Sequence, residues 1–141
     1  MGAPLQRLKR RPDFLRARAA RNKWVTPGLI LQVRSHDGAE REQAAIGGRR
    51  VGFTVSRKVG GAVVRNRVKR RLKSAADAIM TDHAGDHRDY VVIGRAAALT
   101  RPYPALLKDL ETALKKLDAY VGTAPDPVHQ RPGDKREDAA A

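Results

Sequence analysis

Residues 51–73 read VGFTVSRKVGGAVVRNRVKRRLK, and the spacing of the apolar residues changes within this stretch. Val51, Phe53 and Val55 alternate with smaller or polar residues, which is the two-residue period of a strand with one buried face. After a Gly-Gly pair the apolar residues recur every three or four positions, as they do on one face of a helix. The stretch therefore predicts a strand, a turn that contains glycine, and a helix in succession.

The predicted helix runs from Ala62 to about Met80 and combines a narrow apolar face with a basic surface. The apolar face consists of Val64, Val68, Leu72, Ala75 and Ile79. Between positions 65 and 73 there are six cations and no acid, namely Arg65, Arg67, Lys69, Arg70, Arg71 and Lys73. Cations in the first turn of a helix and like charges four residues apart each cost a few tenths of a kcal/mol. An anionic partner would explain why such residues are kept.

The Gly60-Gly61 pair before this helix has no side chain that could cap the first backbone N–H groups. An anion could bind these N–H groups instead, because a helix N-terminus attracts negative charge. Arg57 and Lys58 lie just upstream, so the whole segment predicts a phosphate-binding surface. Asn66 can both donate and accept hydrogen bonds, and it could contact a base edge, a sugar hydroxyl or a neighbouring guanidinium.

The chain carries a formal net charge of +14, and the excess lies in its first half. Residues 1–76 hold 20 Lys and Arg against 4 Asp and Glu, whereas residues 77–141 hold 9 against 11. A charge of this size favours a polyanionic partner. A solvated helix face usually mixes charge signs, and a membrane-bound helix needs a broader apolar face. Nucleic acid is therefore favoured over these two alternatives.

The chain contains no cysteine, which excludes disulfides, thiolate zinc sites and a cysteine nucleophile. No apolar run reaches the ~18 residues of a membrane span or the ~7–15 residues of a signal-peptide core. We therefore expect a cytoplasmic protein that does not associate with membranes. The Arg-rich first residues are also compatible with an organellar transit peptide.

The remaining segments predict a mixed α and β chain. A short helix is expected over residues 14–20, after Pro12 and with Asp13 as its cap or first-turn acid. Strands are expected within residues 24–35 and 90–93, a surface loop over 36–48, and a last helix that carries Leu106, Leu107, Leu110, Leu114 and Leu117 and ends near Gly122. Residues 122–141 have the composition of a disordered tail. One domain, residues 1–121, is predicted, with an α+β fold in which helices cover a largely antiparallel sheet.

The run VGFTVSRKVGGAVVRNRVKRRLK closely resembles the signature of the bacterial ribonuclease P protein subunit, which ends in A-V-x-R-N-R-x-K-R. The resemblance includes the N-terminal RLKRRPDF, the DYVVIGR strand and the closing helix, so it covers about residues 5–121. It implies an α-β-β-β-α-β-α fold with a mostly antiparallel four-stranded sheet, shared with the second domain of a ribosomal protein. It also implies a left-handed βαβ crossover, whereas general rules favour the right-handed form.

The resemblance further implies a function. Family members bind a large catalytic RNA that removes the 5′ leader from precursor tRNA. The expected partners are ribonuclease P RNA and precursor tRNA, with no obligate protein partner. Because the RNA performs the reaction and holds most of the Mg²⁺, no catalytic residue is expected in the protein. The residues expected to bind RNA are Arg57, Lys58, Arg65, Asn66, Arg67, Lys69, Arg70 and Lys73.

A cleft between the first helix and the sheet is implied to bind the single-stranded leader. Phe14 matches an aromatic residue that relatives place there, and a base stacked on such a ring contributes about 1–3 kcal/mol. An ordinary core position for Phe14 is the alternative. Many relatives carry a second aromatic where this chain has Arg18, and a Tyr of the second strand is replaced near Gln32. Arg18 could stack its guanidinium or contact a phosphate instead.

The histidines His83 and His87, with nearby aspartates, are the candidate metal ligands of the chain. Gly85 interrupts the helix that would align them, so a solvated loop is expected and no metal site in the protein. Two functional classes therefore stay open. The first is the protein cofactor of an RNA enzyme, and the second is a non-catalytic RNA-binding module associated with ribosomal or other structured RNA.

Overall fold

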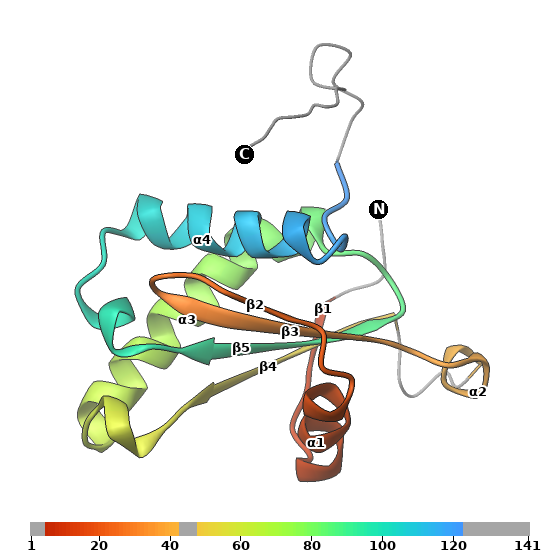
Figure 1. Cartoon of the computed structure of the whole chain (residues 1–141), viewed down its shortest axis with the longest axis horizontal. Coiled ribbons are helices and arrows are strands. Elements are labelled where there is room, and N and C mark those ends of the chain that lie inside the picture. The colour runs from red at the N-terminus through yellow and green to blue at the C-terminus, as the bar shows by residue number, and fades with distance from the viewer. Residues whose placement is uncertain (1–4, 43–47, 123–141) are drawn as a thin grey trace.

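The computed structural model describes residues 5–42 and 48–122, which form one sheet with helices on both faces (Figure 1). The sheet has five strands in the order β1-β4-β5-β3-β2. The strands are β1 (Leu5–Arg7), β2 (Lys23–Val25), β3 (Leu29–Ser35), β4 (Arg49–Val55) and β5 (Arg88–Gly94). Strand β5 is central, and its residues Tyr90 to Val92 are all buried. A continuous apolar run of this kind is typical of a strand that is covered on both faces.

In the described residues, four α-helices and two short 3₁₀ helices accompany the sheet. They are α1 (Arg11–Ala19), α2 (Gly38–Arg41), η1 (Arg57–Val59), α3 (Ala62–His83), η2 (Ala96–Leu99) and α4 (Tyr103–Lys116). Figure 1 shows α1 and α4 on opposite sides of the sheet. The helix predicted to end near Met80 continues to His83, and the last helix ends at Lys116 rather than near Gly122. No helix in the described residues is both long and apolar enough to span a membrane.

The pairing of the strands corrects two details of the predicted sheet. Strand β3 pairs antiparallel with β2 and β5, whereas β4 pairs parallel with β1 and β5. The sheet is therefore five-stranded and mixed instead of four-stranded and mostly antiparallel. Strand β1 was not predicted, because three residues are too few to show a two-residue period. The predicted order α-β-β-β-α-β-α is confirmed from α1 to α4, with β1 and α2 added, and the handedness of the β4-α3-β5 crossover stays a prediction.

The segment predicted as a surface loop over residues 36–48 is more ordered than expected. His36 is buried, and α2 follows it. The Asp37 carboxylate accepts a hydrogen bond of 2.8 Å from the Glu40 backbone N–H, and the Glu40 carboxylate accepts one of 2.9 Å from the Asp37 N–H. This reciprocal pair is a capping box, and the D-x-x-E spacing was its sequence signal. Residues 43–47 and the tail predicted from 123 onward lie outside the described residues.

The main core lies between one face of the sheet and the helices α3 and α4. The α3 residues Val68, Leu72 and Ala75 are buried there, and Val64 and Ile79 are half-buried, so the predicted apolar face of this helix is confirmed. The sheet contributes Leu29, Leu31, Val33, Val51, Val55, Tyr90 and Val92, and α4 contributes Leu106, Leu110, Ala113 and Leu114. Burial of this many apolar side chains, each contributing about 1.5–3 kcal/mol, is the main stabilising term of the fold.

A smaller core lies on the opposite face of the sheet, beneath α1. Leu8, Ala17 and Val91 are buried there, and Phe14 and Ile93 are partly buried against them. Gly52 of β4 allows α1 to approach this closely, because a Cβ atom at Gly52 would lie 2.5 Å from the Phe14 ring. The apolar contacts of helix α1 with the sheet thus come mainly from one aromatic ring and one alanine.

Candidate nucleic-acid interface

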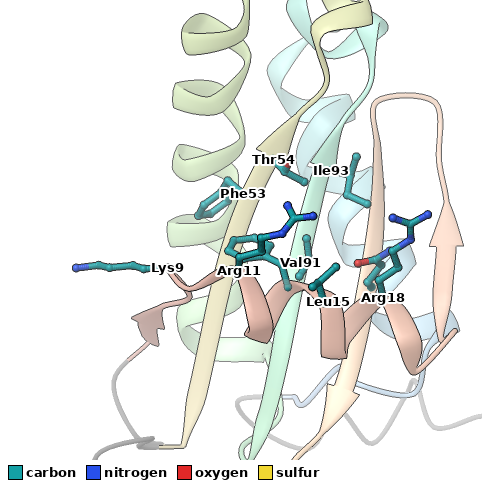
Figure 2. Close-up of a pocket in the computed structure, with 10 residues that line it drawn as sticks. Lys9, Arg11, Leu15, Arg18, Phe53, Thr54, Val91 and Ile93 are labelled. Carbon is teal, nitrogen blue, oxygen red and sulfur yellow. The ribbon is translucent and has the colours of Figure 1, made fainter.

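A cleft of about 530 Å³ lies between α1 and the sheet face that α1 partly covers (Figure 2). The lining residues are Phe14, Leu15 and Arg18 of α1, Gln32 of β3, Phe53 and Thr54 of β4, Val91 and Ile93 of β5, and Lys9 and Arg11 at the start of α1. Figure 2 shows Arg18 at one end of the cleft and Phe53 at the other, with Leu15, Val91 and Ile93 between them. An apolar floor with cations at its margins suits a single nucleic-acid strand, which presents base faces and phosphates side by side.

Phe14 and Arg18, the two residues predicted for a leader cleft, both line this cleft. Phe14 packs on the smaller core and is also part of the cleft wall. The core position and the cleft position that the sequence offered for this residue are therefore compatible. Arg18 is exposed. Gln32, half-buried in β3, also lines the cleft.

Asp13 links α1 to the sheet. Its carboxylate accepts a hydrogen bond of 2.5 Å from Arg16 and lies 3.5 Å from the Arg50 guanidinium of β4. Asp13 is therefore a first-turn acid and not the helix cap, because Arg10 occupies the cap position and makes no side-chain capping bond. Arg50 in turn donates two hydrogen bonds of 2.8 Å each to Asp89 of β5.

Asp89 is the centre of a buried ionic network under this side of the sheet. Its carboxylate, which is fully buried, also accepts hydrogen bonds from Arg34 at 3.0 Å and from His36 at 2.7 Å. Burial by itself would raise the pKa of Asp89, but the hydrogen bonds from Arg50 and His36 outweigh it, so the pKa lies below its usual value. Because the network joins β3, β4 and β5 and reaches Asp13, it fixes the floor of the cleft and the position of α1 together.

The second candidate surface is the basic side of α3, which we call the α3 basic surface and define as Arg65, Asn66, Arg67, Lys69, Arg70 and Lys73. Asn66, Arg67 and Arg70 are exposed, and the other three are half-buried beside the apolar face. Within the described part of the chain, none of these side chains forms an ion pair with an acid. The first turn of α3 has no side-chain cap, and Arg57 and Lys58 of η1 are exposed just before it.

Arg71 has a different role from its neighbours in α3. Its guanidinium donates hydrogen bonds to the carbonyl oxygens of Ala98 at 2.5 Å, Leu99 at 3.1 Å and Arg101 at 2.5 Å. The Ala98 and Leu99 carbonyls lie at the end of η2, and the Arg101 carbonyl lies just after it. The last carbonyl oxygens of a helix have no N–H partner within that helix. Arg71 therefore stabilises the connection between β5 and α4. It is one of the six cations between positions 65 and 73, but it was not among the residues expected to bind RNA.

The structure divides the predicted RNA-binding residues between two faces of the sheet. Phe14 and Arg18 lie with α1 on one face, whereas the α3 basic surface belongs to a helix that packs on the other face. The residues of each set are brought together by the helix that carries them.

Sequence reasoning missed Phe53 and Leu15 as cleft residues. The alternation of β4 indicated that Phe53 faces the core, but β1 pairs only with residues 49–51, so the β4 edge at Phe53 is open. The Arg7 guanidinium lies over the Phe53 ring at 5.1 Å from its centroid. The local sequence gives no signal for an open strand edge, because the pairing of distant segments determines which edges stay open.

The candidate metal ligands do not come together. His83 ends α3, where its Nδ1 atom lies 2.8 Å from the Val121 carbonyl oxygen and its ring stacks on Tyr120 at 4.6 Å between centroids. His87 lies beyond the turn and has a positive φ of 59°. Across residues 5–42 and 48–122, no three His, Asp or Glu side chains form a group that could hold a metal ion.

Comparison with known proteins identifies the family. The model of the family described as Ribonuclease P matches residues 3–118. The chain is 49% identical over 130 residues to the ribonuclease P protein component of Paramagnetospirillum magneticum, covering 89% of this chain and 96% of that protein. It is 46% identical over 113 residues to the corresponding protein of Ruegeria pomeroyi, covering 79% of this chain and 86% of that protein.

Solved structures show the same fold. The ribonuclease P protein of Staphylococcus aureus superposes with a TM-score of 0.64 at 24% identity, covering 82% of this chain and 97% of that one. The protein from Thermotoga maritima superposes with a TM-score of 0.62 at 23% identity, covering 79% and 96%. Taken with the sequence match over residues 3–118, this places the chain in the ribonuclease P protein family.

Proposed function

We propose that this chain is the protein cofactor of ribonuclease P and that it promotes removal of the 5′ leader from precursor tRNA. The observation that carries the proposal is the presence of two distinct surfaces for nucleic acid on one small domain. One is a helix whose cations have no acidic partner in the described residues, and the other is a cleft with an apolar floor and basic margins.

The α3 basic surface is proposed to bind the catalytic RNA. Six polar or cationic side chains project from about two and a half turns of a helix that the main core holds rigidly. Phosphates of a folded RNA would remove the repulsion between these cations and would bind the uncapped N–H groups of the first turn. Arg57 and Lys58 extend this surface from η1.

The α1 cleft is proposed to bind the leader of precursor tRNA. Leaders differ in sequence, and stacking on Phe14 or Phe53 with apolar contact to Val91 and Ile93 would accept any base. The protein side chains bind and position the strand, and the chemistry of cleavage belongs to the RNA. We assign the Mg²⁺ ions mainly to the RNA, because phosphate oxygens are ligands that Mg²⁺ prefers.

Reconstitution tests this proposal. Purified protein is added to the ribonuclease P RNA of the same organism at low Mg²⁺, and cleavage of a precursor tRNA with a 5′ leader is followed. We expect the protein to accelerate cleavage and to lower the Mg²⁺ concentration required, and we expect protein alone to cut nothing. Absence of any acceleration over a range of Mg²⁺ would disprove the proposal.

Salt dependence tests the assignment of the RNA-binding surface. The double variant Arg65→Ala/Arg67→Ala should bind the catalytic RNA more weakly, and the slope of log K against log salt should fall by about 0.7–0.9 for each lost phosphate contact. Lys108→Ala is the matched control, because Lys108 is an exposed cation on α4. An unchanged slope in the double variant would mean that RNA binds elsewhere.

The RNA that copurifies with the protein tests the alternative function. Recovery of ribosomal RNA, with no ribonuclease P RNA, on the purified protein would favour the non-catalytic binding module.

A further inference from the structure

A second, smaller cavity of about 330 Å³ continues the α1 cleft at its Arg18 end. We call it the basic pocket and define it by its lining residues Arg18, Arg21, Asn22, Lys23 and Gln32. Arg18 and Gln32 also line the cleft, so the two cavities meet at these side chains. The composition changes sharply at this boundary, because the basic pocket contains three cations and two amides but no apolar residue and no acid.

The cations of the basic pocket have no structural task in the described part of the chain. Several arginines elsewhere in the fold have such a task. Arg50 and Arg34 bind Asp89, Arg101 binds Asp109, and Arg71 and Arg95 donate to backbone carbonyls. By contrast, Arg18, Arg21 and Lys23 are exposed and form no ion pair or side-chain hydrogen bond with the described residues.

The backbone at Arg21 has a conformation that an arginine adopts at a cost. Its φ is 57°, in the left-handed region, where glycine is favoured and another residue costs roughly 1 kcal/mol. Arg21 closes the C-terminus of α1, where its N–H donates to the Arg18 carbonyl at 3.1 Å. The turn places Arg21 beside Arg18, and strand pairing places Lys23 opposite Gln32. A glycine would fit the turn better, so the Arg21 side chain is expected to have a use.

From these observations we propose that the basic pocket binds a backbone phosphate of the precursor-tRNA leader, beyond the nucleotide that contacts Phe14. This inference rests on the proposed function of the α1 cleft. The pocket supplies guanidinium, ammonium and amide donors, which match phosphate oxygens, and it has no aromatic face on which a base could stack. The bases of the strand would therefore bind in the cleft through shape, and its phosphate would bind in the basic pocket through charge.

The leader is favoured over the catalytic RNA as the source of this phosphate because the pocket is continuous with the cleft. A strand that leaves the cleft past Arg18 enters the pocket directly, whereas the α3 basic surface belongs to a helix on the other face of the sheet. The helix dipole also stabilises cations near the C-terminus of α1, but typically by only 0.3–1 kcal/mol. That effect does not require Lys23, which lies in β2.

The test uses the reconstituted holoenzyme and precursor tRNAs that carry one neutral methylphosphonate at successive leader positions. With the wild-type protein, we expect one position at which the methylphosphonate weakens substrate affinity by about threefold to tenfold. At that same position an abasic nucleotide should have no effect, because the phosphate and not the base is bound. In Arg21→Gly and in Lys23→Ala the methylphosphonate should cause little or no further loss of substrate affinity. In Lys108→Ala it should reduce substrate affinity as much as it does in the wild type.

Arg21→Gly also separates binding from folding. Glycine relieves the left-handed backbone cost, so the melting temperature should stay the same or rise while leader affinity falls. If Arg21→Gly instead unfolds, the test of phosphate binding rests on Lys23→Ala alone. A methylphosphonate effect that persists unchanged in both variants at every leader position would overturn the proposal. The proposal would also be overturned if the two variants lost affinity for the catalytic RNA whether or not a leader is present. A wild-type protein that fails to stimulate cleavage would instead disprove the proposed function.

Discussion

At the scale of single residues, Gly52 sets how closely α1 approaches the sheet. It pairs with Val91 in the β4-β5 ladder, and the Phe14 ring occupies the space where its side chain would be. The wall and the floor of the cleft therefore meet at a position without a side chain. Leu8 lies on the other side of the same space, with its Cβ 3.1 Å from the position of a Gly52 Cβ atom.

Replacement of Gly52 by alanine should disturb the cleft. A Cβ 2.5 Å from the Phe14 ring forces the ring to move, and overpacking of this kind costs about 1–3 kcal/mol. We expect Gly52→Ala to lower the unfolding free energy by that amount and to weaken binding of a precursor tRNA with a leader more than one without. Gly38→Ala is the control, because no atom beyond its chain neighbours and its own helix backbone lies within 4 Å of its Cβ position. Equal behaviour of the two variants in urea unfolding and substrate binding would contradict the placement of Phe14.

At the scale of secondary structure, α3 packs in the core and, in the proposed function, also binds RNA. One face carries Val68, Leu72 and Ala75 into the core, and the remaining surface carries the cations. Its C-terminus is capped by a residue from β4, since the buried Arg49 donates to the carbonyl oxygens of Met80 at 2.7 Å, Thr81 at 3.0 Å and Ala84 at 3.2 Å. Arginines that are alike in the sequence thus have opposite roles in and around this helix.

The neighbours Arg70 and Arg71 make this difference testable. Arg71→Ala leaves three backbone carbonyls without their donor, so the unfolding free energy should fall by about 1–3 kcal/mol. Arg70→Ala removes an exposed cation from a row of like charges, so stability should stay within about 0.5 kcal/mol while RNA affinity falls. Urea unfolding and binding to the catalytic RNA measure the two effects. The assignment fails if both variants lose RNA affinity equally without any loss of stability in Arg71→Ala.

At the scale of the whole molecule, the buried ionic network connects elements that are far apart in the sequence. Asp89 of β5 binds Arg50 of β4 and Arg34 of β3, and Arg34 also donates two hydrogen bonds to Glu40 of α2. The hydrogen bonds from Arg34 lower the pKa of Glu40 from 4.5 to about 2. Both carboxylates therefore favour the folded state when they are ionised.

This network predicts acid sensitivity. A carboxylate whose pKa is lowered in the folded state contributes stability above its unfolded pKa and loses it as pH falls toward its folded pKa. For Glu40 the loss should occur between about pH 4.5 and about pH 2. Glu40→Gln should be less stable than the wild type at pH 7, and its stability should fall less steeply below pH 4.5. Urea unfolding at a series of pH values measures this, and parallel curves for the two proteins would show that Glu40 does not contribute.

The sequence predicted those features that depend on local period and composition. The change from alternation to helical spacing at residues 51–73 located β4 and α3, and the cluster of cations indicated the α3 basic surface. Phe14 and Arg18 were predicted through resemblance to a family, and the structure places both in the cleft. The number of strands and their directions were predicted incorrectly, because β1 is three residues long and its partner lies more than forty residues away.

The sequence by itself therefore determined which segments form helices and strands and which of their faces are apolar or basic, because these depend on neighbours a few positions apart. Only the tertiary structure decided which arginines have partners within the fold. Arg49, Arg50 and Arg71 belong to the same basic half of the chain as Arg18, Arg21 and Arg67. Among the residues that the structure describes, folding brings acceptors from β5, from η2 and the turn after it, and from the end of α3 to the first group but not to the second. Hydrogen-bond partners across the sheet are a property of long-range pairing, and for this reason charge counts along the chain could not separate structural cations from binding ones.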